Sequence, residues 1–274
     1  MSIPLRSWLP LKANTAYVNA NADLRRMCME IIQERRKTVQ GPRSKDVDGR
    51  DLLTFMLEER SDSWTDEELL GHLLNFMSAG HETTAGTLGW ACYAMSQDST
   101  IQDKVRASCQ TLGDDFSVAE IESLAYLDNF IKEVLRLYNP AFQAPREAGA
   151  DITICGTFIP KGTTFNLDPH IMNKHPDIWG PTALEFRPER WAEMKEGDVQ
   201  RDAYAFQSFV NGPRACIGKN FALLELKVLM VALMRELKFE SIGEKVEAES
   251  TLTLHPKGGL RLRVSRLAGQ GEEY

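Results

Sequence analysis

The stretch FVNGPRACIGKNFA, residues 209–222, decides how the rest of the sequence is interpreted. It places Cys216 after a turn-forming segment with Gly212 and Pro213, and just before an apolar pattern with helical spacing. Unpaired N–H groups and the positive end of the helix dipole both favour a thiolate at the start of a helix. Taken alone, Cys216 is equally well explained as a small apolar residue packed near a helix end.

Composition points to a folded, acidic protein. The chain has 274 residues, of which 43% are hydrophobic, so it can bury a substantial core. We expect residues 1–274 to form a single domain. The formal net charge of −7 argues against a nucleic-acid-binding protein, which normally presents a basic face.

The cysteines and the N-terminal region exclude several other classes. The five cysteines are odd in number and scattered, without a C-x-x-C motif, which argues against a disulfide framework or a four-ligand zinc site. The first thirty residues contain no signal-peptide core and no run of about 20 apolar residues. We therefore expect an intracellular, cytoplasmic chain without a transmembrane anchor.

Hydrophobic periodicity predicts a mainly helical chain with small β-hairpins, an α+β fold. One hairpin is expected from residue 151 with its turn at 160–162, a second at 251–264, and a loop-rich connection over 166–216. Capping boxes are expected where Thr65 precedes Glu68 and where Ser117 precedes Glu120. The predicted helices cover residues 20–38, 50–60, 65–97, 99–112, 117–138 and a stretch from Cys216 to about Leu237.

The long helix predicted over 65–97 contains an unusual polar stretch, AGHETT, within an almost uncharged sequence. Gly80 is one of four interior glycines, and each costs about 1 kcal/mol relative to alanine. We interpret Gly80 as a place where a flat, bulky ligand can approach the backbone. From periodicity alone, the favoured interpretation of Glu82 and Thr83 is a hydrogen-bonded polar pair inside a core helix.

Four motifs occur together and in order: AGHETT (79–84), EVLR (133–136), RPERW (187–191) and FVNGPRACIG (209–218). In this combination the sequence resembles the cytochrome P450 family in its eukaryotic, fungal form. The resemblance covers nearly the whole chain and implies the C-terminal portion of a P450-like fold, truncated at the N-terminal side.

The resemblance implies a role for each residue around the cofactor, haem b. Cys216 is the implied thiolate ligand of the iron, and its electron donation favours O–O bond cleavage. Phe209 is implied to shield the thiolate from water. Arg214 and Arg146 match positions whose guanidinium groups pair with the haem propionates.

The resemblance also assigns proton-handling roles on the opposite side of the haem. Thr83 is implied to stabilise the iron-bound hydroperoxide by hydrogen bonding, and Glu82 to belong to a proton relay. Gly80 is implied to lie against the macrocycle. Glu133, Arg136 and Arg190 match a buried structural triad rather than catalytic groups.

The implied activity is that of a haem-thiolate monooxygenase, which inserts one oxygen atom from O₂ into a small apolar organic substrate. Electrons are expected from NADPH through NADPH-cytochrome P450 reductase, and a place in secondary metabolism is expected from fungal relatives. Relatives of this type are bound to the endoplasmic reticulum, whereas this chain is expected to lack the anchor. The alternative is a catalytically inactive remnant, or a protein that only binds haem or another protein.

Overall fold

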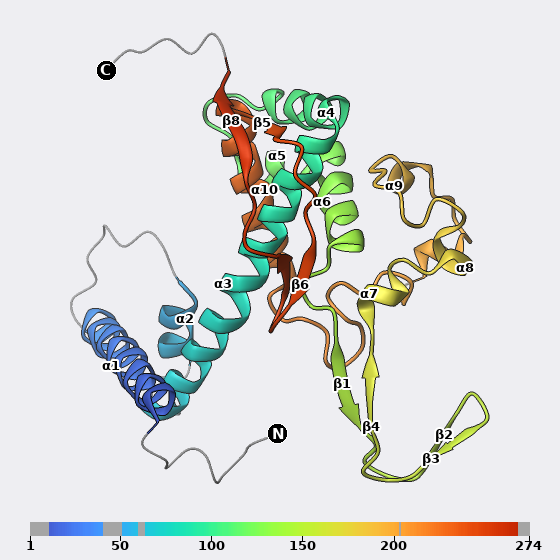
Figure 1. The fold of residues 1–274 in the computed structure, drawn as a ribbon. Helices are drawn as coiled ribbons and strands as arrows, with labels where there is room; N and C mark the ends of the chain where they lie inside the picture. Colours follow the sequence, from blue (N-terminus) through green and yellow to red (C-terminus); the bar gives the residue numbers. More distant parts are fainter. Residues whose placement is uncertain (1–10, 41–50, 60–63, 203, 268–274) are drawn as a thin grey trace. The chain divides into compact units, whose positions relative to one another are not determined.

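The computed structural model describes residues 11–40, 51–59, 64–202 and 204–267, shown in Figure 1. The chain divides into two compact units, Met1–His81 and Glu82–Tyr274. The division falls inside one long helix, α3 (Asp66–Gln97). The expectation of a single domain therefore remains a prediction.

The first unit consists of α1 (Lys12–Gln40), α2 (Leu52–Glu59) and the first part of α3. Arg36 fixes the start of α3, because its Nε donates to Asp66 Oδ1 at 2.7 Å and its Nη2 to the Trp64 carbonyl at 2.8 Å. Apolar side chains from the three helices form its core: Cys28, Ile32, Leu53, Leu57, Leu69 and Leu70.

The second unit is built on a larger helical core. The end of α3 packs there with α4 (Ser99–Gln110), α5 (Val118–Glu122), α6 (Ala125–Leu137) and α10 (Lys219–Glu236). Trp90 of α3 stacks on Tyr138 with ring centroids 4.7 Å apart. Fully buried members of this core include Met95, Val105, Leu127, Phe130, Val134, Met230 and Met234.

The described residues also form four two-stranded antiparallel sheets, and Figure 1 shows two of them extending away from the helical core. The connection between β4 (Thr164–Leu167) and α10 carries α7 (Pro169–Met172), α8 (Pro176–Trp179), α9 (Arg190–Glu193) and the 3₁₀ helix η1 (Val199–Arg201). The pairs are β1 (Ala144–Glu147) with β4 (Thr164–Leu167), β2 (Ile152–Ile154) with β3 (Thr157–Ile159), β5 (Leu237–Ser241) with β8 (Leu262–Arg266), and β6 (Ala248–Ser250) with β7 (Leu254–Pro256).

The mainly helical α+β prediction is confirmed, and both predicted capping boxes are present. Glu68 N donates to Thr65 Oγ1 at 3.2 Å and Thr65 N to Glu68 Oε2 at 2.9 Å. Ser117 and Glu120 make the same reciprocal pair at the start of α5. Capping chemistry is local, which is why the sequence alone could specify it.

Other predictions of local structure were wrong. The helix expected over 117–138 is two helices, α5 and α6, interrupted at Ser123 and Leu124. The hairpin after 151 turns at Cys155 and Gly156, with φ of 47° and 78°, whereas residues 160–162 lead into β4, which pairs with β1. The strands near 251–264 do not pair with each other, because β7 pairs with β6 and β8 with β5.

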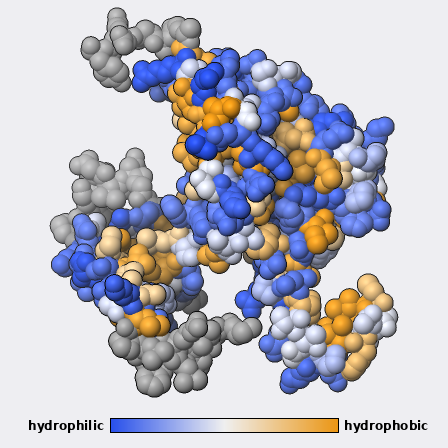
Figure 2. Space-filling model, in the orientation of Figure 1, coloured by the Kyte–Doolittle hydropathy of each residue, from blue (hydrophilic) through white to orange (hydrophobic). Residues whose placement is uncertain are grey.

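The β2–β3 hairpin carries apolar side chains into solvent, visible as orange surface on the hairpin in Figure 2. Phe158 is 62% exposed and Ile154 is 43% exposed. Of the helices in the described part of the chain, none is long and apolar enough to cross a membrane.

Candidate functional site

The cysteine loop, residues 209–218, lies just before α10, and hydrogen bonds within its own backbone fix its conformation. The Cys216 N–H donates to the Phe209 carbonyl at 2.9 Å, and the Ala215 N–H donates to the Gly212 carbonyl at 3.0 Å. Gly212 adopts φ of 82°, a left-handed conformation that glycine takes without steric cost. Val210 is also left-handed, at φ 56°, so the loop needs support from elsewhere in the fold.

Cys216 is a free, exposed thiol with large apolar neighbours. Ile217 is 92% exposed and Phe221 is 73% exposed, whereas Phe209 is half-buried and packs against the core of the second unit. The Lys219 ammonium lies 6.0 Å from the centre of the Phe209 ring. The loop therefore presents an exposed sulfur together with two exposed apolar side chains, close to the N-terminal end of a helix.

The predicted proton-handling residues lie on α3. Glu82 and Thr83 are half-buried, and the Thr87 hydroxyl donates to the Thr83 carbonyl at 2.8 Å. Farther along α3, Trp90 belongs to the same core cluster as Leu226 of α10. The helix that carries Thr83 and the helix that follows Cys216 are thus packed through one core.

The remaining predicted site residues are distributed over other elements. Arg146 is on β1, where its Nη1 donates to the Pro145 carbonyl at 2.9 Å, and Arg214 is exposed in the cysteine loop. Gly80 belongs to the first unit, on the part of α3 before the division. The structure therefore joins Phe209 directly to Cys216, and places Arg146 and Thr83 on separate elements of the second unit.

A buried ionic cluster supports this unit from within. Glu133 and Arg136 are 0% exposed, and Arg190 is 5% exposed. Glu133 Oε1 accepts from Arg190 Nε at 2.8 Å and from Arg136 Nη2 at 2.9 Å, and Oε2 accepts from Arg136 Nε at 2.9 Å. The Arg187 N–H and the Trp191 indole N–H complete the shell of the carboxylate, at 2.9 and 3.0 Å.

The two guanidinium groups also bind backbone carbonyls, which ties distant loops together. Arg136 donates to the carbonyls of Asn173 and Ala183, at 2.9 and 2.6 Å, and both arginines reach the Glu185 carbonyl at 3.0 Å. An ion pair buried to this degree is tolerated only because every charge has close partners. The structural role implied for these residues matches the contacts observed.

A lysine next to this cluster has an altered proton affinity. Lys174 Nζ lies 2.8 Å from His170 Nε2. Burial, together with the positive charge of Arg136, lowers the pKa of Lys174 to about 8. Burial and then the neighbouring Lys174 likewise lower the pKa of His170.

Two residues that the sequence analysis passed over connect the cluster to the cysteine loop. Asn173 is 0% exposed, its Oδ1 accepts from the Gln207 N–H at 2.9 Å, and its Nδ2 donates to Ser208 Oγ at 2.8 Å. Ser208 Oγ in turn donates to the Leu135 carbonyl at 2.9 Å. Nothing in the local pattern around position 173 distinguishes it from a surface asparagine in a short helix.

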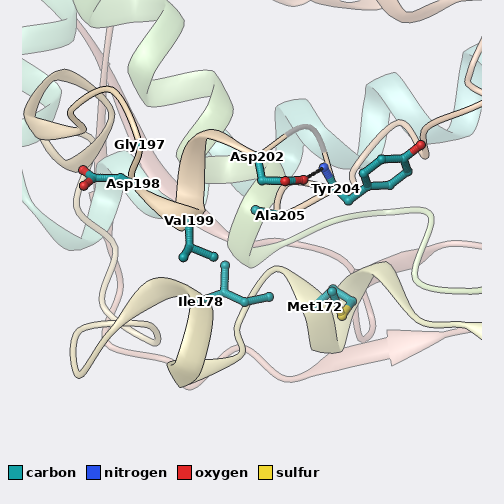
Figure 3. A pocket seen from close by; sticks show the side chains of 8 residues that line it. All are labelled: Met172, Ile178, Gly197, Asp198, Val199, Asp202, Tyr204 and Ala205. Atoms are coloured by element: carbon teal, nitrogen blue, oxygen red, sulfur yellow. Dashed lines mark hydrogen bonds between the residues drawn. The ribbon is translucent and has the colours of Figure 1, made fainter. Parts of the chain in front are cut away.

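A separate hollow lies between α7, α8 and η1, shown in Figure 3. It has a volume of about 560 Å³ and none of the predicted site residues lines it. Its floor is apolar, with Met172, Ile178 and Val199, and two acidic residues stand at its edge, Asp198 and Asp202.

Comparison with known proteins identifies the family. The model of the family described as Cytochrome P450 matches residues 1–262. The chain belongs to the cytochrome P450 family. Members of this family use haem, so haem is the cofactor that the family implies here.

Individual relatives give the same result. The chain is 30% identical to cytochrome P450 monooxygenase FUM15 of Gibberella moniliformis, covering 96% of this chain and 53% of the relative. It is 33% identical to cytochrome P450 monooxygenase sphH of Aspergillus fumigatus, covering 95% and 50%. It is 32% identical to cytokinin hydroxylase of Arabidopsis thaliana, covering 97% and 52%. The P450 chain thus spans about half the length of the curated relatives it matches.

The fold comparison agrees. A crystal structure of a cytochrome P450, CYP102L1, superimposes with a TM-score of 0.80 at 27% sequence identity, covering 93% of this chain and 58% of that one. The residues present also fit haem chemically. An exposed thiol at a helix start, bordered by the exposed Ile217 and Phe221, offers a sulfur ligand together with an apolar surface for a macrocycle.

Proposed function

We propose that this chain is the haem-binding, C-terminal portion of a haem-thiolate monooxygenase. The observation that carries the proposal is Cys216, which the cysteine loop holds exposed ahead of α10, in a chain whose family match extends over residues 1–262. When bound, haem supplies the activation of O₂ and the insertion of one oxygen atom into the substrate.

In this proposal the cysteine loop binds and tunes the iron. Cys216 is the thiolate ligand, and it lies just before α10, which begins at Lys219. The backbone bond between the Cys216 N–H and the Phe209 carbonyl fixes the loop, and the half-buried Phe209 ring excludes water from one side. Interactions of this kind around a ligand orient it and adjust the properties of the metal.

The other residues handle protons and charge. The Thr83 hydroxyl would hold a proton near the bound cofactor, and the Glu82 carboxylate would serve as the proton source for it. Positioned proton transfer of this type contributes about 10² to 10⁴ in rate. Arg214 and Arg146 pair with the carboxylates at the edge of the cofactor, because a guanidinium group matches a carboxylate in a bidentate geometry. Gly80 lies in the other unit, and its contact with the cofactor remains a prediction from the family resemblance.

The substrate class and electron source follow from the same proposal. The substrate is a small apolar organic molecule, and NADPH supplies electrons through NADPH-cytochrome P450 reductase. Matches to fungal monooxygenases such as FUM15 and sphH support a role in secondary metabolism.

The test is the carbon monoxide spectrum of the chain after reconstitution with haem and reduction. The expected result is the red-shifted Soret band of thiolate-ligated ferrous haem in the wild type, and its absence in Cys216→Ser. Cys155→Ser is the matched control, because Cys155 is also a free, exposed thiol. A chain that binds no haem would instead support the inactive remnant, and a band unchanged in Cys216→Ser would contradict the assignment of Cys216 as the ligand.

A further inference from the structure

The side chain of Asn173 is fully enclosed and bridges two parts of the second unit. Its backbone carbonyl accepts from Arg136 of the buried cluster, while its side-chain amide binds Gln207 and Ser208. One residue therefore contacts the cluster through its main chain and the entry of the cysteine loop through its side chain. A side chain with 0% exposure and both amide ends hydrogen-bonded has a single orientation available.

Ser208 continues this connection. It is 6% exposed, its hydroxyl accepts from Asn173 and donates to the carbonyl of Leu135 on α6. The next residue is Phe209, whose carbonyl accepts the Cys216 N–H at 2.9 Å. The Val210 N–H donates to the Gln207 carbonyl, also at 2.9 Å, so the left-handed residue at the start of the loop is fixed to the same anchor.

The rest of the loop is held by the Asn211 side chain, whose Nδ2 donates to the Phe206 carbonyl at 3.5 Å, and by backbone bonds within the loop and to α10. Residues 212–217 are all exposed. The N–H groups of Ala215 and Cys216 donate to the carbonyls of Gly212 and Phe209, which belong to the loop itself. The backbone at Cys216 is thus fixed in part by its N–H bond to the Phe209 carbonyl, and Phe209 directly follows the buried Ser208.

We propose that Asn173 and Ser208 are positioning residues for the cysteine ligand. Their hydrogen bonds connect the buried Glu133 cluster to the segment that carries the Phe209 carbonyl, and this restricts the position of the Cys216 N–H that donates to it. The inference rests on the proposed function for its meaning in haem chemistry, but the mechanical coupling concerns residues of this chain only.

The test uses the full chain and two variants with a matched control. Ser208→Ala removes one buried hydroxyl and leaves the backbone intact, and Asn173→Ala removes both amide contacts. Ser96→Ala is the control, because the Ser96 hydroxyl also donates to a backbone carbonyl, that of Tyr93 at 2.7 Å, on a different element. Amide hydrogen exchange is measured at Cys216 and at Met230, a fully buried residue of α10 that reports global opening.

In Ser208→Ala we expect exchange at Cys216 to accelerate about tenfold relative to Met230, which is the effect of losing one buried hydrogen-bonded hydroxyl. In Ser96→Ala the ratio of the two rates should stay within about twofold of wild type. If Cys216 and Met230 accelerate equally in Ser208→Ala, the hydroxyl only stabilises the fold, and the inference is overturned. Should Asn173→Ala fail to fold, Ser208→Ala alone decides.

A second readout relates the coupling to the cofactor. With haem bound, Ser208→Ala should lose part of the thiolate-ligated carbon monoxide band, while Ser96→Ala keeps all of it; equal bands would contradict the inference. If the wild type itself shows no thiolate band, the proposed function fails, but the exchange ratio still tests the positioning of Cys216. The two failures are therefore distinguishable.

Discussion

The buried Glu133 cluster and the cysteine loop lie in the same unit but are built in opposite ways. In the cluster, one carboxylate accepts from Arg136, Arg190, the Arg187 N–H and the Trp191 indole, and Glu133 and Arg136 are 0% exposed. In the cysteine loop, backbone hydrogen bonds fix the conformation, and Cys216 remains exposed.

The difference separates two requirements of a cofactor-binding fold. Buried charges must be completely paired, so the cluster can tolerate almost no change. An exposed ligand loop must instead leave its binding atom free, so its own side chains contribute little to stability. Mutations should therefore divide into those that damage the fold and those that damage only the site.

The largest effect should come from Glu133→Ala. The change leaves Arg136 and Arg190 buried without their carboxylate, which should lower the free energy of unfolding by about 3–5 kcal/mol. Urea-induced unfolding followed by circular dichroism measures this change. The control is Glu193→Ala, because Glu193 pairs with Arg187 at 2.8 Å in an exposed salt bridge that should be worth less than about 1 kcal/mol. A loss of similar size in both variants would remove the distinction between the two regions.

Thr83→Ala should damage the site and leave the fold intact. We expect the haem-loaded chain to keep its thiolate spectrum, while electrons are diverted to hydrogen peroxide and product formation falls by about 100-fold. The peroxide formed per NADPH consumed, in the presence of the reductase, is the measurement. Thr87→Ala serves as control, because it removes a hydroxyl one helical turn away. Equal peroxide yields in the two variants would contradict the role assigned to Thr83.

A smaller effect on stability is expected for Lys174→Met, a substitution next to Arg136 of the buried cluster. Burial and Arg136 lower the pKa of Lys174 to about 8, so the folded state binds fewer protons than the unfolded state between pH 8 and about 10.4. Wild-type stability should therefore rise with pH across this window, and below pH 8 the full cost of charging Lys174 is present. Lys174→Met should remove the slope and raise the free energy of unfolding at pH 7 by on the order of 1 kcal/mol, allowing for solvent screening.

Unfolding measured at a series of pH values checks this prediction. The matched control is Lys104→Met, because Lys104 forms a salt bridge with Glu189 at 2.6 Å and its side chain is half exposed. A pH slope that persists in Lys174→Met would show that another group is responsible.

The smallest effect on folding should come from Cys216→Ser. The side chain is exposed, so the free energy of unfolding without haem should change by no more than about 0.5 kcal/mol. Urea unfolding of the haem-free chain is the measurement. A loss above about 1 kcal/mol would mean that the sulfur contributes to packing, and the contrast between loop and cluster would no longer hold.

Local features of this fold could be predicted from the sequence, whereas long-range pairing could not. The helix from 66 to 97 and the capping boxes depend on neighbouring residues, and the structure has them. The pairing of β1 with β4 and of β5 with β8 depends on which segments the helical core brings together. The turn at Cys155 was missed because a left-handed cysteine followed by glycine is a weaker signal than Pro160 with Gly162.

The candidate site shows the same limit. The cysteine motif, Glu82 and Thr83 could be selected from their order along the chain and the family resemblance. Asn173 and Ser208 could not, because their importance comes from contacts across 35 residues of sequence. No periodicity or motif records that kind of contact.

The bonds from Asn173 to Gln207 and Ser208 also have a topological consequence. They bring the two ends of the segment 173–208, which contains α8, α9 and η1, together and so close it into a loop. Lengthening this loop costs little free energy, since the entropy of loop closure grows only with the logarithm of loop length. Insertions near residue 197 should therefore change the hollow there and leave the hydrogen bonds between Asn173, Gln207 and Ser208 in place.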